Sequence, residues 1–539
     1  MRNGGGTEIG MKGMTLGKIA EAAAGTLYLS VLKADGSYQV YEEGSPAGAD
    51  EAVRSAFCDF RGREIQSVTT DSRKAEEGSL FAAIVGARAD GHRFIASVYD
   101  RGALCVFSER ELAGDDLFTP EARKHFSGCG EESAKSLFRP WILVRDTQTA
   151  LGAAAALYLD ILGIPVTGVT GSVGKTSTKE MIASVLSRKL RTLKTEGNFN
   201  NDLGLPLTVF RLTEEDEIAV LEMGISHFGD MHRLAKIARP DTAVITNIGT
   251  CHLEYLENRD GVLRAKTEIF DHVRENGHIL LNGNDDKLRT VHDVKGRSLL
   301  FFGVSSEEEG TEELSAGSKV TYPPEELRGR CVCASDIRPL GFDGSLCRMD
   351  TPEGSFELKV PVPGIHNISN AAAATAVGLT YGLSFEQIRE GIAAMQTISG
   401  RFRILHTPAM TVIDDCYNAN PVSMKSSLKV LAGCDTRRVA ILGDMGELGK
   451  DEIALHREVG AYAAGCTDRL IVIGTLGRYI CDAALEARPE LPAVWYASVD
   501  EFLEKCGSGF CKGDTVLVKA SHFMNFPRIV EALTAGQAE

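Results

Sequence analysis

The stretch GVTGSVGKTST, Gly168 to Thr178, has the composition and spacing of a phosphate-binding loop. The run PVTGVTG before it predicts a strand and the run KTSTKEM after it predicts a helix, which is the context that such a loop requires. The loop N–H groups and the helix N-terminus would then face the phosphates of a nucleotide. Lys175 would reach the terminal phosphates, and the hydroxyl of Thr176 would bind Mg2+. The alternative is a glycine turn with a lysine nearby.

The loop departs from the commonest pattern at one position. Its glycines fall at 168, 171 and 174, and Val169 stands where that pattern has its first glycine. This argues against a G protein or an ordinary kinase. We predict that ATP is held by the run Gly171, Ser172, Val173, Gly174, Lys175, Thr176 and Ser177.

Other polar side chains follow predicted strands or begin a predicted helix. Glu222 ends the strand IAVLE, which puts a carboxylate at the ligand end of a sheet, although it could also be a surface carboxylate. His252 follows the strand TAVITNIG, where a lone histidine is usually a hydrogen-bonded structural residue. Asn367 and Asn370 lie one helical turn apart in GIHNISNAAAA, either as a pair of ligand-facing amides or as the polar start of a helix.

The segment DGVLRAKTEIFDHV places a lysine on an apolar helix face. Read as a helix, it aligns Val262, Lys266, Ile269, Phe270 and Val273 in one stripe. Such a lysine usually extends its ammonium group to water at the edge of the stripe. A lysine held in an apolar environment has a pKa lowered by up to about 3–5 units. A neutral amine can add CO2 to give a carbamate, which would bind Mg2+ instead of repelling it.

The elements around these residues alternate between strands and helices. From Trp141 onward they predict a mostly parallel sheet covered by helices, and a second βα series follows SGRFRI. We therefore expect an α/β fold with three domains, 1–140, 141–398 and 399–539. The polar segments 112–138 and 305–318 are expected to be surface loops.

Composition limits the classes of function. A chain of 539 residues exceeds one hydrophobic core, and a formal net charge of -16 argues against nucleic acid or an anionic membrane as partner. The 13 cysteines are scattered, as in a reducing cytoplasm. The most apolar stretch, ALGAAAALYLDILGIPV, contains Asp160 and predicts a buried helix rather than a membrane span. We expect a cytoplasmic monomer.

Taken together, the motifs resemble those of the Mur ligases, the ATP-dependent amide-forming enzymes of bacterial cell-wall precursor synthesis, to which folylpolyglutamate synthase is related. The resemblance covers nearly the whole chain. It rests on the segments TTDSRKAEEGSLFAAIVGARADGHRFI, EGNFNNDLGLPLTVFRL, LEMGISHFGDM, NIGTCHLEYL, RAKTEIF, GIHNISNAAAA, GRFRI, DDCYNANPVSM and LGDMGELG. NFNND and YNANP are similar to the type that joins D-Ala-D-Ala to UDP-MurNAc-tripeptide, and the DNPR-like signature of another type is absent.

The resemblance implies an N-terminal domain for the UDP substrate, a central P-loop ATPase domain and a C-terminal Rossmann-like domain. It implies that ATP binding also involves Asn367, Asn370, Arg401 and Asp415. The metal ligands that it implies, for two Mg2+ ions, are Thr176, Glu222, His252 and carbamylated Lys266. The substrate contacts are expected from Asp71, Ser72, Arg73, Asn198, Asn200 and Asn201. One departure is KASH, Lys519 to His522, where the family usually has KGSR.

The implied reaction is amide ligation through an acyl phosphate, with catalytic roles for Lys175, Glu222, His252 and Lys266. Arg401 and the phosphate loop lie in different βα series, so we expect the C-terminal domain to close onto the central one through residues 399–403. Two alternatives stay open on the sequence. One is a related ligase with another amino-acid or glutamate acceptor, and the other is a P-loop ATPase switch that ligates nothing.

Overall fold

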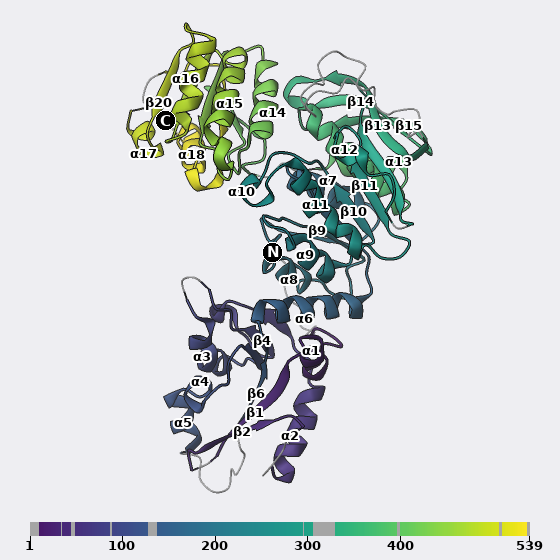
Figure 1. Cartoon of the computed structure of the whole chain (residues 1–539), viewed down its shortest axis with the longest axis vertical. Helices are drawn as coiled ribbons and strands as arrows, with labels where there is room; N and C mark the ends of the chain where they lie inside the picture. Colours follow the sequence, from purple (N-terminus) through teal and green to yellow (C-terminus); the bar gives the residue numbers. More distant parts are fainter. Residues whose placement is uncertain are drawn as a thin grey trace. The chain divides into compact units, whose positions relative to one another are not determined.

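The computed structural model describes residues 10–33, 35–44, 49–86, 89–127, 137–294, 296–305, 329–395, 399–505 and 509–535. The chain divides into two compact units (Figure 1). The first comprises Met1–Pro165, Thr195–Ala219 and Lys236–Ala238, and the second comprises Val166–Lys194, Val220–Ala235 and Arg239–Glu539. Strands and helices alternate in both units, which confirms the predicted α/β class.

The first unit is built on a six-stranded sheet of order β2-β1-β6-β5-β4-β3. Its strands are β1 Thr26–Leu32, β2 Tyr38–Glu42, β3 Ser67–Thr69, β4 Ser79–Ala82, β5 Cys105–Ser108 and β6 Leu137–Leu143. Strands β3 to β6 are parallel, and β1 is antiparallel to both of its neighbours. Tyr28 stacks on the fully buried Trp141 at 4.4 Å between ring centroids, which fixes the centre of this sheet.

Helices complete the first unit. They are α1 Leu16–Ala22, α2 Glu51–Gly62, α3 Ile95–Asp100, α4 Gly114–Leu117, α5 Pro120–Ser127, α6 Thr147–Leu162 and α8 Gly204–Val209. The Asp146 side chain caps the start of α6, and Gly163 ends it in the left-handed conformation. The apolar stretch predicted as a buried helix is therefore α6. Part of the predicted loop 112–138 is instead helical, as α4 and α5, and its residues 128–136 lie outside the described residues.

A nine-stranded sheet, of order β15-β14-β13-β12-β11-β10-β7-β9-β8, carries the phosphate loop. Its strands are β7 Val166–Thr170, β8 Thr192–Lys194, β9 Ile218–Glu222, β10 Thr242–Ile245, β11 His278–Asn282, β12 Ser298–Val304, β13 Cys331–Pro339, β14 Ser345–Thr351 and β15 Gly354–Val360. The pairs β7–β10, β10–β11, β11–β12 and β12–β13 are parallel, whereas β13–β14 and β14–β15 are antiparallel. Every residue of β7, β9 and β10 is buried, as in a sheet covered on both faces.

The helices around this sheet are α7 Lys175–Leu186, α9 Asp230–Ala238, α10 Leu253–Leu256, α11 Arg259–Thr267, α12 Ile365–Thr380 and α13 Phe385–Ala393. The alanine-rich α12 packs against both α7 and β12. Of the predicted acidic loop 305–318, all but its first residue lies outside the described residues.

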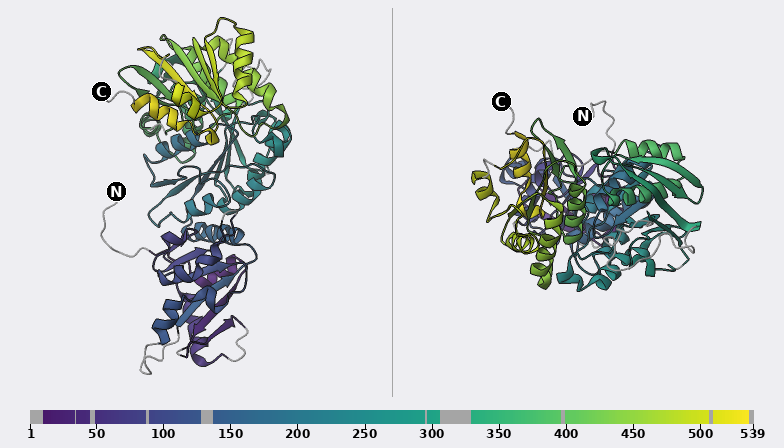
Figure 2. Two further views of the ribbon diagram at one scale, coloured as in Figure 1. Left: turned by 90° about the vertical axis from the view of Figure 1, so that its left-hand side faces the viewer. Right: turned by 90° about the horizontal axis from the view of Figure 1, so that it is seen from above.

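The C-terminal part of the second unit holds a third sheet, of order β16-β17-β21-β18-β19-β20. Its strands are β16 Arg403–His406, β17 Met410–Asp414, β18 Arg438–Gly443, β19 Arg469–Ile473, β20 Ala493–Tyr496 and β21 Asp514–Lys519, of which only β16 is antiparallel to its neighbour. Its helices are α14 Pro421–Ala432, α15 Glu452–Cys466, α16 Gly477–Ala487, α17 Val499–Lys505 and α18 Pro527–Ala535. One apolar cluster joins the sheet to α14, α15 and α16, and a second joins it to α17 and α18. The ribbon of this part, green to yellow in Figure 2, shows helices beside the sheet. This two-layered covering confirms the predicted Rossmann-like arrangement.

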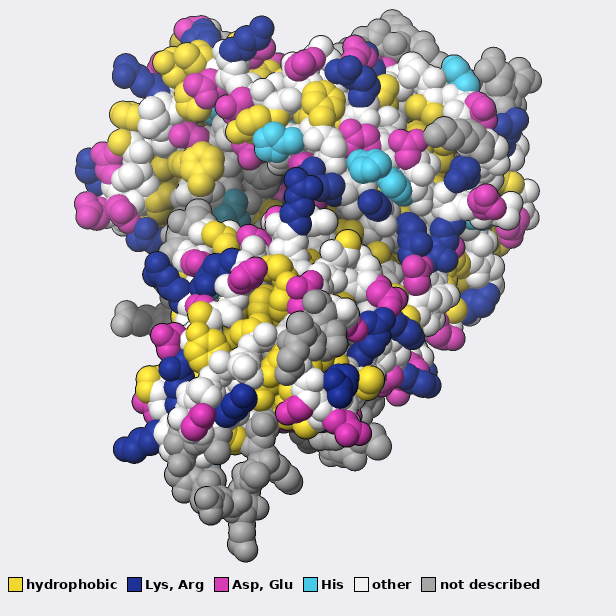
Figure 3. All heavy atoms as spheres, turned by 60° about the horizontal axis from the view of Figure 1, so that its bottom comes forward, with side chains coloured by type: hydrophobic (Ala, Val, Ile, Leu, Met, Phe, Trp, Pro, Cys, Tyr) yellow, Lys and Arg dark blue, Asp and Glu magenta, His cyan; other side chains and the backbone are white. Residues whose placement is uncertain are grey.

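The surface is charged but mixed in sign. On the face drawn in Figure 3, basic and acidic side chains are interspersed. Of the helices in the described ranges, none combines the length and the apolarity that a membrane crossing needs.

Candidate active site

The phosphate loop joins β7 to α7 and depends on two glycines. Gly171 has φ +150° and Gly174, which precedes the first turn of α7, has φ +82°, both outside the range that other residues favour. A Cβ atom at Gly171 would also lie 1.9 Å from Oγ1 of Thr246. The loop can therefore pass close to the β10 end only because this position has no side chain.

Lys175 begins α7 and folds back over this loop. Its Nζ donates to the carbonyl oxygens of Gly171 at 2.9 Å and Ser172 at 3.4 Å. The ammonium group thus lies at the helix N-terminus, where the first N–H groups have no partner within the helix. A cation and several N–H donors at one point form an anion site.

A cavity of about 170 Å³ opens beside this loop. The predicted ATP-binding residues that line it are Ser172, Val173, Gly174, Lys175, Thr176, Ser177, Asn367, Asn370, Arg401 and Asp415. They come from α7, α12 and the start of the C-terminal sheet. The structure therefore gathers all but one of that predicted set, the exception being Gly171, which lies in the same loop.

Asn367 and Asn370 are buried on α12 and bonded to each other. Asn370 donates from Nδ2 to Oδ1 of Asn367 at 3.2 Å, and its Oδ1 accepts from the Thr178 hydroxyl at 2.9 Å. The amides thus link α12 to α7 beside the cavity. His366, which the sequence reasoning missed, also lines the cavity, and desolvation lowers its pKa to about 4, so the ring is neutral at pH 7.

Arg401 contacts the phosphate loop directly. Its Nη2 donates to Oγ1 of Thr176 at 3.2 Å, and its guanidinium group lies 3.9 Å from the ring centroid of Tyr417. The ring of Tyr417 also meets His522 edge-on at 5.6 Å. His522, the last residue of KASH, is therefore one aromatic ring away from Arg401.

Asp415 lines the cavity with its charge already balanced. Its Oδ2 accepts from Nζ of the buried Lys519 and from the Ser427 hydroxyl, each at 2.6 Å. Its Oδ1 accepts from the Phe402 N–H at 3.2 Å. Asp415 thus holds the start of the C-terminal sheet together in this structure.

Two of the predicted metal ligands are in contact. The Thr176 hydroxyl donates to Oε1 of Glu222 at 3.2 Å, and the Glu222 side chain is only 2% exposed. Nζ of the buried Lys179, a further residue that the sequence reasoning missed, lies 3.9 Å from Oε2 of Glu222 and 2.8 Å from Glu180. Hydroxyl and carboxylate oxygens are hard ligands and fit Mg2+.

His252 is placed differently. Its Nδ1 lies 2.8 Å from Oε2 of Glu447, a residue of the C-terminal part, and this contact is the first cause that lowers the pKa of Glu447. Both residues have positive φ, +52° and +60°. Among the described residues, no group of three or more His, Cys, Asp or Glu side chains is close enough to hold one metal ion.

Lys266 is fully enclosed. It lies on α11 and is 1% exposed, so the interpretation that its ammonium group extends to water is wrong. Desolvation lowers its pKa to about 8, a nearby Cys251 opposes that shift, and the positive charge of Lys175 adds to it. A substantial fraction of this amine is therefore neutral at mildly alkaline pH.

The predicted substrate contacts lie in the first unit. Asp71 forms a two-point ion pair with Arg73, at 2.9 and 2.8 Å, which lowers the pKa of Asp71 to about 2. Ser72 begins a short helix, Ser72–Lys74, which Asp71 caps and which contains Arg73. The three asparagines lie in the segment before α8. The Asn201 side chain accepts from the N–H of Gly204, the first residue of α8, at 2.8 Å. The Asn198 side chain is exposed and the Asn200 side chain is half-buried. The charges of Asp71 and Arg73 therefore balance each other.

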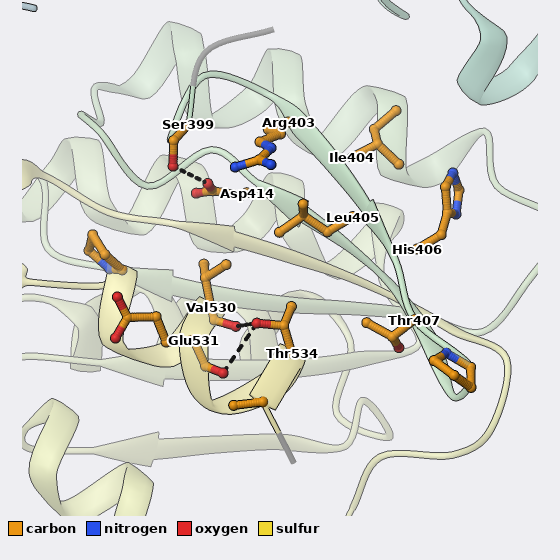
Figure 4. A pocket seen from close by; sticks show the side chains of 13 residues that line it. Ser399, Arg403, Ile404, Leu405, His406, Thr407, Asp414, Val530, Glu531 and Thr534 are labelled. Carbon is orange, nitrogen blue, oxygen red and sulfur yellow. Dashed lines mark hydrogen bonds between the residues drawn. The ribbon is translucent and has the colours of Figure 1, made fainter. Parts of the chain in front are cut away.

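A second cavity, of about 750 Å³, lies in the C-terminal part between β16 and α18 (Figure 4). No predicted site residue lines it. At its edge, Asp414 accepts from the Ser399 hydroxyl at 3.2 Å and from the Gly400 N–H at 2.8 Å. These bonds attach the predicted joint 399–403 to β17, so this segment is part of the C-terminal sheet.

Three protein-family models match the chain and together cover most of it. Residues 64–159 match the Mur ligase family catalytic domain, residues 169–378 the Mur ligase middle domain, and residues 400–522 the Mur ligase glutamate ligase domain. The chain is 34% identical over 473 residues to the UDP-N-acetylmuramoyl-tripeptide–D-alanyl-D-alanine ligase of Bacillus subtilis, covering 87% of this chain and 93% of that one. It is 35% identical over 424 residues to the Escherichia coli protein of that name, covering 78% and 84%.

Solved structures agree with these matches. A structure of MurF from Acinetobacter baumannii superposes with a TM-score of 0.76 at 29% identity, covering 97% of this chain and 99% of that one. The MurF ligase of Thermotoga maritima in complex with ADP superposes with a TM-score of 0.70 at 27% identity, covering 87% and 97%. The similarity therefore runs through all three sheets.

Proposed function

Because the chain belongs to the Mur ligase family, we propose that it joins D-alanyl-D-alanine to UDP-MurNAc-tripeptide in an ATP-dependent amide ligation of bacterial peptidoglycan synthesis. The observation that carries this proposal is the cavity at the N-terminus of α7, where the phosphate loop, Asn370 and Arg401 come together. The curated relatives at 34% and 35% identity bear the name of this activity. These names favour D-Ala-D-Ala ligation over a related ligase with another amino-acid acceptor and over a P-loop ATPase that ligates nothing.

The chemistry requires activation of the substrate carboxylate. A free carboxylate and an amine exchange a proton and form an unreactive salt. Transfer of the γ-phosphoryl group of ATP to that carboxylate gives an acyl phosphate and ADP. The amine of D-Ala-D-Ala then attacks the acyl carbon, loses a proton and expels phosphate to leave the amide.

The residues of the cavity fit the first step. Lys175 and the N-terminal N–H groups of α7 would bind the transferring phosphoryl group and balance its charge. Arg401 would add a second cation beside Thr176. Water must be kept from the acyl phosphate, so we propose that the C-terminal part closes over the bound ligands. Because residues 399–403 are bonded to β17, this segment would move with that sheet.

Thr176 and Glu222 would supply oxygen ligands for Mg2+. Mg2+, when bound, would neutralise charge on the phosphates. The hydroxyl and the carboxylate are already in contact, as adjacent ligands of one ion would be. His252 would have to leave Glu447 to take part.

Lys266 is proposed as the source of a further carboxylate-like ligand. Its neutral amine would add CO2 to form a carbamate and release one proton. The support is its burial, its pKa of about 8 and its place on α11. The resulting anion would be balanced by the metal and by Lys175.

The remaining assignments follow from the same proposal. We propose that residues 1–140 bind the UDP substrate, through Asp71, Ser72 and Arg73, with Asn198, Asn200 and Asn201 near the peptide. Residues 141–398 would bind ATP, and residues 399–539 would close the site. Buried thiols such as Cys105 and Cys347 suit a reducing bacterial cytoplasm, and we propose a monomer there.

One assay tests the proposal. Phosphate release is measured with ATP, Mg2+ and UDP-MurNAc-tripeptide against a panel of amine acceptors, including D-Ala-D-Ala, glutamate and diaminopimelate. We expect release only with D-Ala-D-Ala, with one amide formed per phosphate. Full-rate hydrolysis of ATP alone would favour the switch, and preference for another amine would favour the related ligase.

A further inference from the structure

We propose that Asn247, just after β10, is the positioning residue of the phosphate loop. Its side-chain amide holds the Val173 peptide in place, so that only the N–H groups at the start of α7 are presented to phosphate. The inference rests on the proposed function, because it takes the α7 N-terminus to be the phosphate site.

Asn247 bonds to the middle of the loop through both its side chain and its backbone. The Val173 N–H donates to Oδ1 of Asn247 at 2.9 Å, and Nδ2 of Asn247 donates to the Val173 carbonyl at 3.0 Å. The Ser172 N–H donates to the carbonyl of Asn247 at 3.0 Å. A second donor, the hydroxyl of Thr246, reaches the Val173 carbonyl at 2.6 Å. Two N–H groups and one carbonyl group of the loop are thereby bonded to Asn247.

These bonds decide which groups face an anion. A phosphate site needs N–H groups that have no other partner and point at the anion, and carbonyl groups that point away from it. The N–H groups of Ser172 and Val173 are engaged by Asn247, and two donors hold the Val173 carbonyl. The donors left for phosphate are those of the first turn of α7, which the helix itself cannot use. Ser172 and Val173 would then form the wall of the cavity.

Asn247 can hold the loop because its own segment is fixed. The Asn282 amide donates to the Thr246 carbonyl at 2.8 Å. On the other side, the Ile248 N–H donates to Oδ2 of the buried Asp285 at 2.8 Å. The Ile248 carbonyl accepts from Nε of Arg259 at 2.8 Å. The loop is therefore held against the rigid ends of β10 and β11.

The chain contains a matched control for this contact. Asn284 makes the same two bonds with Val304, since its Oδ1 accepts from the Val304 N–H and its Nδ2 donates to the Val304 carbonyl, each at 2.8 Å. Both asparagines are half-buried. Neither Asn284 nor Val304 lines the ATP cavity. The two sites differ in what the held peptide belongs to and in that Asn247 itself lines the ATP cavity, whereas Asn284 does not.

The test compares Asn247→Leu with Asn284→Leu in the full chain. Melting temperature, Mg-ADP affinity by calorimetry, and kcat and KM for ATP are measured for both variants. We expect similar drops in melting temperature. Only Asn247→Leu should lose ADP affinity, by about tenfold, the equivalent of one net hydrogen bond. Its kcat should fall further than its ADP affinity, since phosphoryl transfer needs closer alignment than binding.

Each other outcome counts against the inference. Wild-type ADP affinity and kcat in Asn247→Leu would overturn it, and so would an equal loss of ADP affinity in Asn284→Leu. If Asn247→Leu does not fold, Asn247→Ser carries the same expectation. Tighter ADP binding in either Asn247 variant would mean that the Val173 N–H must be released for phosphate, which also overturns it. A wild-type chain that binds no ADP overturns the proposed function together with the inference.

Discussion

Two lysines in the second unit show how surroundings divide one residue type into two kinds of chemistry. Lys175 is half-buried at the start of α7, and two loop carbonyls accept bonds from its ammonium group. Lys266 lies on α11, is 1% exposed and has a pKa of about 8. The first presents its ammonium group at the start of α7, where phosphate is expected. Burial makes the second easier to deprotonate than an ordinary lysine.

Removal of the Lys175 cation should have the largest effect. We expect Lys175→Ala to lower kcat by about 10³-fold while the protein stays folded, because among the described residues the side chain hydrogen-bonds only to its own loop. The assay is steady-state amide formation, with circular dichroism for the fold. Lys189→Ala is the matched control, since Lys189 likewise donates to two carbonyls, those of Tyr381 and Gly382, away from the cavity. Equal losses in the two variants would contradict a phosphate role.

The second effect concerns the charge that Lys266 carries in the active protein. If it carries a carbamate, Lys266→Arg should lose about 10²-fold in kcat, because a guanidinium group cannot add CO2 or bind Mg2+. Lys266→Ala should be as weak but partly recover with added formate or acetate. The same Ala protein with and without the carboxylate provides its own folding control. Near-normal activity in Lys266→Arg would exclude the carbamate.

A smaller, several-fold effect is expected from CO2 itself. Wild-type protein kept in CO2-free buffer should lose activity and recover when bicarbonate is added, whereas Lys266→Ala should not respond. Recovery requires the neutral amine. With a pKa of about 8, each pH unit below that value lowers the neutral fraction by about tenfold, and the recovery rate should fall equally when the concentration of dissolved CO2 is held constant. A recovery rate that does not change between pH 6 and pH 8 at constant dissolved CO2 would argue against Lys266 as the responding group.

The smallest expected effect is a change in the radius of gyration when ligands bind. Arg401 contacts Thr176 in this structure, and we expect ATP and the UDP substrate together to favour this arrangement of the C-terminal part over a more open one. Small-angle scattering should therefore show a slight decrease in the radius of gyration when a non-hydrolysable ATP analogue and the UDP substrate are added together. Lys175→Ala should not compact under the same conditions. An unchanged radius in the wild type at saturating ligand would count against closure.

Local patterns predicted much of this molecule. The strand before Gly171, the helix after Gly174 and the apolar stripe around Lys266 each depend on neighbours within a few residues, and all three were visible in the sequence. The stripe placed Lys266 on an apolar face but did not predict its full burial, because such a lysine usually extends its ammonium group to water. The helix over residues 120–127 was missed because its sequence is polar, so periodicity gave no signal.

Contacts between residues far apart in the sequence could not be predicted from it. Asn247 meets Val173 across 74 positions, and an asparagine after a strand resembles any loop residue. The pairing of His252 with Glu447 joins two different sheets, and no spacing rule connects them. Lys179 looked like an ordinary polar helix residue, and its burial beside Glu222 follows only from how α7 packs on β9.

The close approach of Gly171 to Thr246 has a consequence for how such a site can change over generations. A side chain at Gly171 would strike the Thr246 hydroxyl, and that hydroxyl is also bonded to Val173. No substitution at 171 is therefore neutral, whatever residue stands at 246, because the Thr246 backbone and the positive φ also exclude a side chain there. A change at 246 alone removes one of the two donors to the Val173 carbonyl and leaves Asn247 as the other. Descendants of this sequence should therefore keep Gly171, whereas a change at Thr246 should cost less.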